Sequence, residues 1–313
     1  MKICFTFAKA TSNKRMKNFD VIIIGGSYAG LSAAMALGRS LRNVLIIDGG
    51  KPSNRQTPHS HNFITHDGKT PKEISDLAKE QVLKYKTVKF QNGVVVKMHK
   101  DVDGFKVITE NKDDFHAKKL IIASGIKDII PDIPGFSECW GISILHCPYC
   151  HGYEIRNEVT GILSNGDMAF DFSKLVFNLT KNLVLFTNGR SSLNNDQTEK
   201  LQKNRINIIE DEIEEVQQAN GKIQKMIFKN GKEVSLKALY AKIPFTQNIN
   251  SDDLGLELTE QGFIKVDMMH KTNIPGVFAC GDNVTMMRSV ANAIAQGNFA
   301  GAVVNRELAE EDF

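Results

Sequence analysis

The sequence predicts an α/β protein built from two similar domains, and three observations lead to this prediction. Residues 19–48 and 159–186 each read as a strand, a helix and a second strand, with small residues after the first strand. Turn-separated strands follow each unit, up to residue 109 in the first and residue 234 in the second. The last third of the chain returns to apolar strands and ends in a helix rich in alanine and glycine. An arrangement that occurs twice in one chain indicates two related nucleotide-binding domains.

Length and composition limit the class of protein. The chain has 313 residues and a net charge of +3, with no basic stripe for nucleic acid and no polybasic cluster for a membrane surface. Its five cysteines are an odd number and, apart from Cys147 and Cys150, lie far apart, which favours a reducing, cytoplasmic compartment over a secreted disulfide framework. No apolar run reaches the ~18 residues of a transmembrane helix. We therefore expect neither nucleic acid nor membrane as a partner.

The N-terminal residues do not read as part of a domain. Residues 1–18 hold one short apolar patch and then a polar, basic run, without a convincing signal-peptide cleavage site. We expect this leader to be disordered, and Met16 is a candidate start of the natural chain. The predicted division is residues 1–18 as leader, 19–126 with 243–313 as one domain, and 127–242 as a second domain.

The first unit carries the turn of a dinucleotide site. Phe19–Ile24 reads as a buried parallel strand, and residues 25–30, Gly-Gly-Ser-Tyr-Ala-Gly, lead into a helical pattern over residues 31–41. Asp48 ends the next strand at the ~20-residue spacing of an acidic group that binds a ribose hydroxyl. The pyrophosphate would lie on the helix N-terminus. Ser27 stands where glycine is usual, and a βαβ unit without nucleotide is the alternative.

Three elements follow the first unit. Residues 54–63 form a loop rich in hydrogen-bond donors, in which His59 and His61 are only a weak metal pair. Residues 70–85 read as a helix with proline in its first turn, and residues 94–109 read as a hairpin around an Asp-Gly turn. Residues 119–125 read as a strand that ends in small residues, which allows a cofactor to approach closely.

The second unit repeats the architecture with a poorer site. Residues 159–163 and 183–186 read as strands around a helix over residues 170–180, but Ser164 and Asn165 stand where a phosphate loop carries glycine. No acidic residue ends the second strand, and only Arg190 is placed to meet a 2′-phosphate. A domain kept for structure alone is the alternative.

The last third supplies further strands and a helix. Residues 262–266 read as a strand, residues 272–282 read as a turn, a strand and then Gly281-Asp282 opening a helix, and residues 287–308 read as the closing helix. Asp282 could then hydrogen-bond a cofactor hydroxyl. Cys280 lies in an apolar strand and reads as a core residue.

Residues 146–154, His-Cys-Pro-Tyr-Cys-His-Gly-Tyr-Glu, carry the strongest chemical signal. Cys147 and Cys150 can close into a disulfide and reopen, which transfers two electrons, and the flanking histidines can lower a thiol pKa or deliver a proton. Structural cysteines, half of a zinc site and c-type haem attachment are the alternatives. Zinc would need a second ligand pair, and haem attachment would need export.

These features together resemble the low-molecular-weight thioredoxin reductase family, over nearly everything from residue 19 to residue 308. The family's marks are the glycine-rich turn, an Ala-Thr-Gly-like strand end at Ala123-Ser124-Gly125, Cys-x-x-Cys at residues 147–150, and Gly281-Asp282. The Cys-x-x-Cys-His motif is similar to a branch that includes the gliotoxin- and holomycin-type dithiol oxidases.

The resemblance implies two Rossmann-like, three-layer domains, the second inserted in the first, in a homodimeric enzyme. FAD and NADPH or NADH would be the cofactors, and a protein or low-molecular-weight disulfide the substrate. It also implies that Cys150 faces the flavin, that Cys147 attacks the substrate disulfide, and that His151 takes the place of the usual proton donor. The residues expected to contact FAD are Gly25, Gly26, Ser27, Tyr28, Ala29, Gly30, Asp48, Gly49, Arg55, Gln56, Asn62, Val94, Ala123, Ser124, Gly125, Gly281, Asp282, Arg288 and Ser289. Those expected at the nucleotide are Gly166, Asp167 and Arg190, and no metal site is expected.

The departures from the family leave three functions open. Asn188 and Gly189 occupy the turn where the family has paired arginines for the 2′-phosphate. A reductase that draws electrons from NAD(P)H is the first hypothesis. A flavin-dependent oxidase that passes electrons from a dithiol to oxygen is the second, and a non-enzymatic flavin or haem redox sensor is the third.

Overall fold

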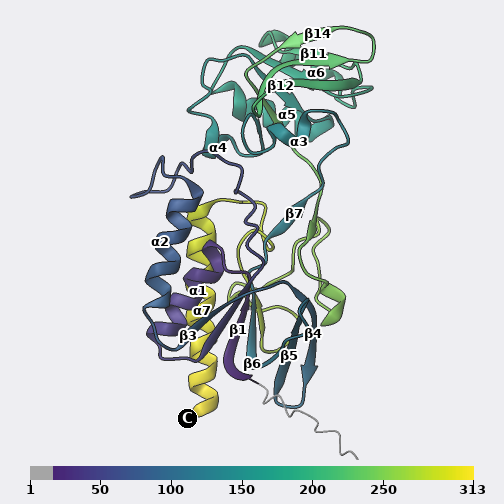
Figure 1. Cartoon of the computed structure of the whole chain (residues 1–313). Helices are drawn as coiled ribbons and strands as arrows, with labels where there is room; N and C mark the ends of the chain where they lie inside the picture. Colours follow the sequence, from purple (N-terminus) through teal and green to yellow (C-terminus); the bar gives the residue numbers. More distant parts are fainter. Residues whose placement is uncertain (1–16) are drawn as a thin grey trace, which may run out of the picture.

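The computed structural model describes residues 17–313 and shows two α/β domains joined by a narrow connection (Figure 1). The first domain is built on a seven-stranded sheet in the order β3-β2-β1-β6-β5-β4, with β17 beside β6. Strands β3, β2, β1, β6 and β17 run parallel, and β5 and β4 continue from β6 as an antiparallel hairpin. The strands are β1 (Lys17–Ile24), β2 (Val44–Asp48), β3 (Val88–Asn92), β4 (Val95–Asp101), β5 (Gly104–Thr109), β6 (Asp114–Ile122) and β17 (Val277–Ala279).

Three helices cover one face of this sheet, as Figure 1 shows: α1 (Tyr28–Arg39), α2 (Pro71–Leu83) and α7 (Val290–Asp312). Successive residues of β1 point to opposite faces, so Val21 and Ile23 enter the core beneath the helices. Ile22 and Ile24 enter a second core with Phe105 and residues near β17. This double burial explains why β1 reads as a continuous apolar run.

Glycine allows α1 and α7 to touch at the backbone. A Cβ atom at Gly297 would lie 2.0 Å from the carbonyl oxygen of Ala29, and one at Gly301 would lie 2.6 Å from that of Ala33. Both distances are shorter than any real contact, so the alanine- and glycine-rich composition of the last helix is a packing requirement.

The second domain has the same plan. Its parallel sheet follows the order β11-β10-β9-β15-β8, and a separate antiparallel sheet contains β12-β13-β14. The strands are β8 (Ile144–Leu145), β9 (Thr160–Leu163), β10 (Leu183–Phe186), β11 (Asn207–Ile209), β12 (Ile213–Ala219), β13 (Lys222–Phe228), β14 (Glu233–Ser235) and β15 (Ala238–Ala241). The helices are α3 (Phe136–Cys139), α4 (Pro148–His151), α5 (Gly166–Phe177) and α6 (Asn195–Lys203).

Two short antiparallel strands connect the domains: β7 (Ile126–Asp128) and β16 (Phe245–Gln247). In Figure 1 they lie between the two bodies. All strands of the second domain fall between them in sequence, so this domain is inserted in the first. The 3-10 helix η1 (Ser251–Asp253) follows on the return. Within residues 17–313, none of the helices has the length and apolar character needed to cross a membrane.

Several predicted boundaries differ from the structure. β1 begins at Lys17, because Lys17 and Asn18 still pair with Phe115 and His116, while residues 1–16 of the expected leader lie outside the described chain. The helix pattern over residues 31–41 begins earlier, at Tyr28. The predicted helix 170–180 begins at Gly166, because the side chain of Asn165 accepts from the Gly166 N–H and caps it there.

Two predictions for the last third are wrong. Residues 262–266 make only an isolated bridge, Leu258 to Ile264, because their other backbone bonds go to turns. Gly281-Asp282 does not open a helix. A further turn follows, and α7 starts at Val290, where the Ser289 side chain accepts from the N–H of Asn292 and supplies the cap.

The backbone contact between α1 and α7 gives a first prediction. Gly297→Ala should lower the free energy of unfolding by ~1–3 kcal/mol, because the new methyl group collides with the Ala29 carbonyl oxygen. Chemical denaturation followed by circular dichroism measures this loss. Asn298→Ala, at an exposed position of the same helix, is the control and should be neutral or slightly stabilising. Equal stability of Gly297→Ala and the wild type would contradict the tight contact.

Candidate functional site

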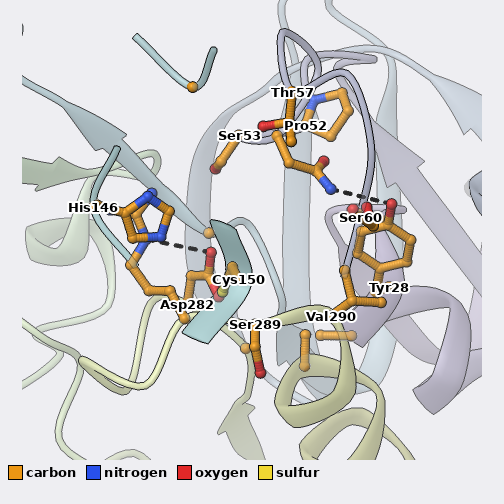
Figure 2. A pocket seen from close by; sticks show the side chains of 18 of the residues that line it. Tyr28, Pro52, Ser53, Thr57, Ser60, His146, Cys150, Asp282, Ser289 and Val290 are labelled. Carbon is orange, nitrogen blue, oxygen red and sulfur yellow. Dashed lines mark hydrogen bonds and ion pairs between the residues drawn. The ribbon is translucent and has the colours of Figure 1, made fainter. Parts of the chain in front are cut away.

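A pocket lies where the first domain meets the inserted one, and Figure 2 shows it from close by. Its volume is about 1210 Å³ when the open solvent at its entrance is included. Segments far apart in sequence form its wall: the glycine-rich turn, the loop after β2, the residues between the end of β6 and Gly141, the dithiol segment, and the residues around the start of α7. They contribute Gly25, Ser27, Tyr28, Ala29, Asp48, Lys51, Pro52, Ser53, Asn54, Thr57, Ser60, His61, Ala123, Ser124, Gly125, Asp128, Trp140, Gly141, Leu145, His146, Cys150, His151, Gly281, Asp282, Arg288, Ser289, Val290 and Ala293.

The glycine-rich turn forms the floor. Gly25 has a φ of +104°, and a Cβ atom there would lie 2.2 Å from the carbonyl oxygen of Ala123 at the end of β6. No side chain caps the N-terminus of α1, so its first N–H groups remain available to a ligand. Asp48 accepts from the N–H of Gly26 at 2.8 Å and from that of Gly50 at 3.0 Å, which fixes its carboxylate beside the turn.

The loop after β2 forms one side wall and reaches the second domain. Asn54 donates to the Tyr28 hydroxyl at 3.2 Å, and that hydroxyl donates to the carbonyl oxygen of Pro71 at 3.1 Å. His61 lies between two carboxylates, with Nδ1 3.6 Å from Asp67 and Nε2 3.6 Å from Glu154. Since Glu154 belongs to the dithiol segment, this contact joins the two domains beside the pocket.

The dithiol segment closes the pocket from above. Cys147 and Cys150 form a disulfide with Cα atoms 5.3 Å apart. Cys147 is the N-cap of the single-turn helix α4, and its Sγ accepts from the N–H of Cys150 at 3.2 Å. Cys150 and His151 line the pocket, and Cys147 does not. Figure 2 shows Cys150 among the residues that line the pocket.

Neither histidine beside the disulfide is a cation near neutral pH. Burial lowers the pKa of His146 to about 3, and the charge of Arg288 adds to this effect. Burial lowers the pKa of His151 to about 4, although Glu154 acts in the opposite direction. The expectation that a cationic His151 stabilises a thiolate is therefore wrong. As a neutral imidazole, His151 can instead accept a proton from a thiol.

A buried charged cluster lies beside His146. Arg288 donates two hydrogen bonds to Asp128, at 2.9 and 3.1 Å, and its Nε lies 3.6 Å from Asp282. Trp140 donates to the same Asp128 at 3.2 Å. Burial raises the pKa of Asp282, although Arg288 acts against this.

Many of the expected cofactor residues meet in this pocket. The sequence analysis also names residues that do not line it: Gly26, Gly30, Gly49, Arg55, Gln56, Asn62, Val94 and Cys147. Gly30 supports the turn from behind, since a Cβ atom there would lie 1.9 Å from the Gly25 carbonyl oxygen. Arg55 is exposed and donates to the carbonyl oxygen of Pro52, because the loop turns it away.

Several lining residues are absent from that set. Asn54, Thr57, Ser60 and His61 belong to the polar loop 54–63, whose many donors were the available signal. His146 and Trp140 come shortly before the first cysteine, so the Cys-x-x-Cys motif was the available signal for them. Asp128 gives no local signal, because its partners come from other segments. Cys280 is fully buried and burial raises its pKa to about 12, so it remains a core thiol.

The residues expected at the nucleotide, Gly166, Asp167 and Arg190, lie in the second domain, away from this pocket. Hydrogen bonds within that domain already involve each of them. The side-chain oxygen of Asn165 accepts from the N–H of Gly166 at 2.8 Å and from that of Ser192 at 2.9 Å. Its Nδ2 donates to the carbonyl oxygen of Arg190 at 2.9 Å. Asp167 accepts from Gln197 at 2.6 Å. These bonds tie the loop after β10 to the start of α5.

No group of three or more His, Cys, Asp or Glu within residues 17–313 is arranged to hold a metal ion. In particular, His59 and His61 gain no third ligand. Their ring centroids lie 6.4 Å apart.

Comparison with known proteins identifies the relatives. The sequence profile of the pyridine nucleotide-disulphide oxidoreductases matches residues 19–297. The chain is 34% identical to thioredoxin reductase tcpT of Claviceps purpurea (strain 20.1), over 92% of this chain and 94% of that protein. Its structure resembles that of a putative thioredoxin reductase TrxB from Bacillus anthracis, with a TM-score of 0.90, 30% identity, and 94% and 100% of the two chains covered. It also resembles a Lactococcus lactis thioredoxin reductase described as the FR conformation, with a TM-score of 0.60, 26% identity, and 93% and 99% covered. The predicted family, its branch and the two Rossmann-like domains are confirmed.

The two buried histidines give a second prediction, on stability against pH. The unfolded chain binds their protons near pH 6.5, whereas the folded chain binds them only near pH 4 and 3. Stability should therefore be complete above pH 6.5 and fall as the pH drops toward 4, by about 1.4 kcal/mol per pH unit for each histidine. Urea denaturation at a series of pH values measures this slope. His151→Gln should reduce the slope, while His59→Gln, at an exposed position, should leave it unchanged. An unaltered slope in His151→Gln would show that His151 is not held neutral.

Proposed function

The chain belongs to the pyridine nucleotide-disulphide oxidoreductase family, and we propose that it passes electrons from NAD(P)H by way of FAD and the Cys147/Cys150 dithiol to a protein or low-molecular-weight disulfide. Membership implies an enzyme with FAD and NAD(P)H as cofactors, and thioredoxin reductase-like relatives act on disulfides. The non-enzymatic sensor is contradicted by this membership. The observation that carries the proposal is the position of the redox disulfide beside the pocket, with Cys150 on the pocket wall.

The pocket suits FAD on the chemistry of its own residues. The uncapped N-terminus of α1 suits the pyrophosphate, and the missing Cβ at Gly25 lets the turn lie against β6. Asp48 would hold a ribose hydroxyl, and the buried Nε of Arg288, a residue that lines the pocket, has no hydrogen-bond partner among the described residues. When bound, FAD supplies the two-electron carrier that a dithiol–disulfide pair requires.

The residues of the dithiol segment divide the work. In the reduced state the Cys147 thiolate attacks one sulfur of the substrate disulfide, and the first substrate thiol leaves. Cys150 then attacks Cys147, which releases the second substrate thiol and restores the Cys147–Cys150 disulfide. His151, which is neutral and lines the pocket with Cys150, accepts the proton of the Cys150 thiol. Its place next to Cys150 in the chain and on the pocket wall supports this role.

The division of labour gives a third prediction. Cys147→Ser should leave a lone Cys150 thiolate against bound flavin, and a long-wavelength charge-transfer band should appear in the absorption spectrum. Cys150→Ser should show no such band, and both variants should lose disulfide turnover because each lacks a dithiol. Cys139→Ser, at a buried cysteine outside the pocket, is the matched control. The opposite pattern of bands would reverse the two roles.

A specific observation favours a second candidate, the dithiol oxidase. The side-chain oxygen of Asn165 already accepts from the N–H of Gly166 at the start of α5. Asn188 carries no charge, and its Oδ1 already accepts from the N–H of Ile213. The second domain therefore offers little to a nucleotide phosphate. In this reaction a small dithiol is oxidised to its disulfide and its two electrons pass to molecular oxygen.

Nucleotide use gives a fourth prediction. Without an arginine pair on the 2′-phosphate, the rates of flavin reduction by NADPH and by NADH should agree within ~10-fold. Anaerobic titration with each nucleotide, followed by flavin bleaching, measures this. If neither bleaches the flavin while dithiothreitol does, and oxygen is consumed, the oxidase replaces the reductase. A strong preference for NADPH that disappears in Arg190→Ala would show that Arg190 recognises the phosphate.

The remaining parts of the proposal are the cell compartment, the assembly and the domain division. The cysteine usage supports a cytoplasmic location, and the family supports a homodimer. The position of the β7–β16 connection supports the division into residues 19–126 with 243–313 and residues 127–242.

A further inference from the structure

One buried carboxylate touches both domains at the pocket. Asp128, whose side chain is 10% exposed, accepts both terminal nitrogens of Arg288 at 2.9 and 3.1 Å. It also accepts the indole N–H of Trp140 at 3.2 Å. Paired bonds of this kind between arginine and a carboxylate fix orientation as well as distance.

The three residues come from three different parts of the fold. Arg288 lies in the first domain, just before α7, and Asp128 ends the connecting strand β7. Trp140 belongs to the inserted domain and is separated from the segment that carries the disulfide by the short strand β8. It forms a bridge to Ile144, and its ring centroid lies 6.2 Å from that of His146, the neighbour of Cys147. A continuous set of contacts therefore runs from the first domain to the dithiol.

Arg288 has no substitute for Asp128. Its Nε forms no hydrogen bond within the described chain, and Asp282 lies at 3.6 Å, beyond hydrogen-bond distance. The other charged or titratable groups that face it are Lys242 and His146, a like charge and a neutral ring. Without the Asp128 carboxylate, the buried guanidinium would lose both of its hydrogen bonds to a charged acceptor and keep only the longer ion pair with Asp282, which is strongly unfavourable.

The comparisons indicate that the two domains can be arranged in more than one way. The chain matches the B. anthracis and L. lactis structures over almost the same share of its length, but with TM-scores of 0.90 and 0.60. Nearly equal coverage with unequal scores indicates that the same elements are placed differently. The connection itself is only the pair β7–β16, so contacts elsewhere must select one arrangement.

We propose that Asp128 is a positioning residue that holds the inserted domain with Cys150 against the pocket, by linking Arg288 of the first domain to Trp140. The link acts on the dithiol through Trp140 and His146 and touches neither sulfur. The proposal goes beyond the function proposed above and depends on it only for the reaction that the dithiol serves. The contact of His61 with Glu154, at 3.6 Å and partly exposed, is a second and weaker link between the same domains.

The test measures the distance between the domains directly. Spin labels are attached to Ile64→Cys on the loop of the first domain and to Glu199→Cys on α6, both at exposed positions. Cys4 is replaced by serine throughout, while Cys139 and Cys280 are buried and Cys147 and Cys150 are paired in the oxidised protein. Pulsed electron–electron double resonance on the FAD-loaded chain then gives the distribution of distances between the two labels.

Asp128→Asn should shift this distribution. An amide has one acceptor oxygen and no charge, so it cannot hold both Arg288 and Trp140. We expect a single distance in the wild type and a second, well-separated distance in the variant, with the ratio of the two arrangements changed by ~10-fold or more. Trp140→Phe, which keeps the ring and loses only the N–H, should give a smaller shift. The matched control is Asp211→Asn, which breaks a surface ion pair with Lys232 inside the second domain and should give the wild-type distance.

A second measurement separates positioning from general destabilisation and from turnover. In the Cys147→Ser background, Asp128→Asn should weaken the charge-transfer band in proportion to the lost arrangement, at unchanged FAD content. If Asp128→Asn does not fold or loses FAD, Trp140→Phe carries the test in both measurements. A wild-type distance distribution in folded, FAD-loaded Asp128→Asn or Trp140→Phe would overturn the proposal, whichever substrate the enzyme uses.

Discussion

The pocket depends on several contacts in which two backbone segments meet directly, with no side chain between them. The end of β6 lies against Gly25, Gly25 lies against Gly30 in α1, and α1 lies against Gly297 in α7. A methyl group at any of these three glycines would come within about 2 Å of a carbonyl oxygen. This stack brings the uncapped N-terminus of α1 to the pocket floor and places the residues before α7 beside it. Packing and ligand binding therefore require the same residues at this point.

The surroundings of the disulfide are less polar than the motif suggests. Two histidines flank the cysteines in sequence, but burial keeps both rings neutral. Near His146, the charges belong to Arg288, Asp128 and Asp282, which bind mainly to one another. A neutral imidazole next to a thiol serves proton transfer, whereas a cation would serve thiolate stabilisation. The structure therefore favours acid–base chemistry at His151.

The two domains share one plan and differ in their loops. In the first, the turn after β1 leaves the helix N-terminus free for a ligand. In the second, the side chain of Asn165 accepts from the corresponding N–H and ties the neighbouring loop through Ser192 and Arg190. The same hydrogen-bonding groups that remain available to a ligand in one domain stabilise a closed loop in the other. Fold and binding capacity are thus separate properties of the unit.

The sequence by itself determined the elements whose signals are local. Continuous apolar runs predicted β1 and β2, the glycine-rich turn and Asp48 predicted the first site, and the spacing of Cys147 and Cys150 predicted the disulfide. Local patterns predicted the ends of the helices less well, because capping side chains set them. Asn165 caps the start of α5, and Ser289 caps the start of α7. The expected helix at Asp282 failed because Gly-Asp is equally compatible with a turn.

Only the tertiary structure decided which distant residues meet. No sequence pattern marks Asp128 as a functional residue. It nevertheless joins Arg288 to Trp140, because the connection β7–β16 places it between the domains. His61 and Glu154 meet for the same reason. The neutral state of His146 and His151 was also undetectable in the sequence, since a pKa depends on burial by segments that lie far away along the chain. Local interactions fix the elements, and contacts between remote segments fix the charges and neighbours that make a site.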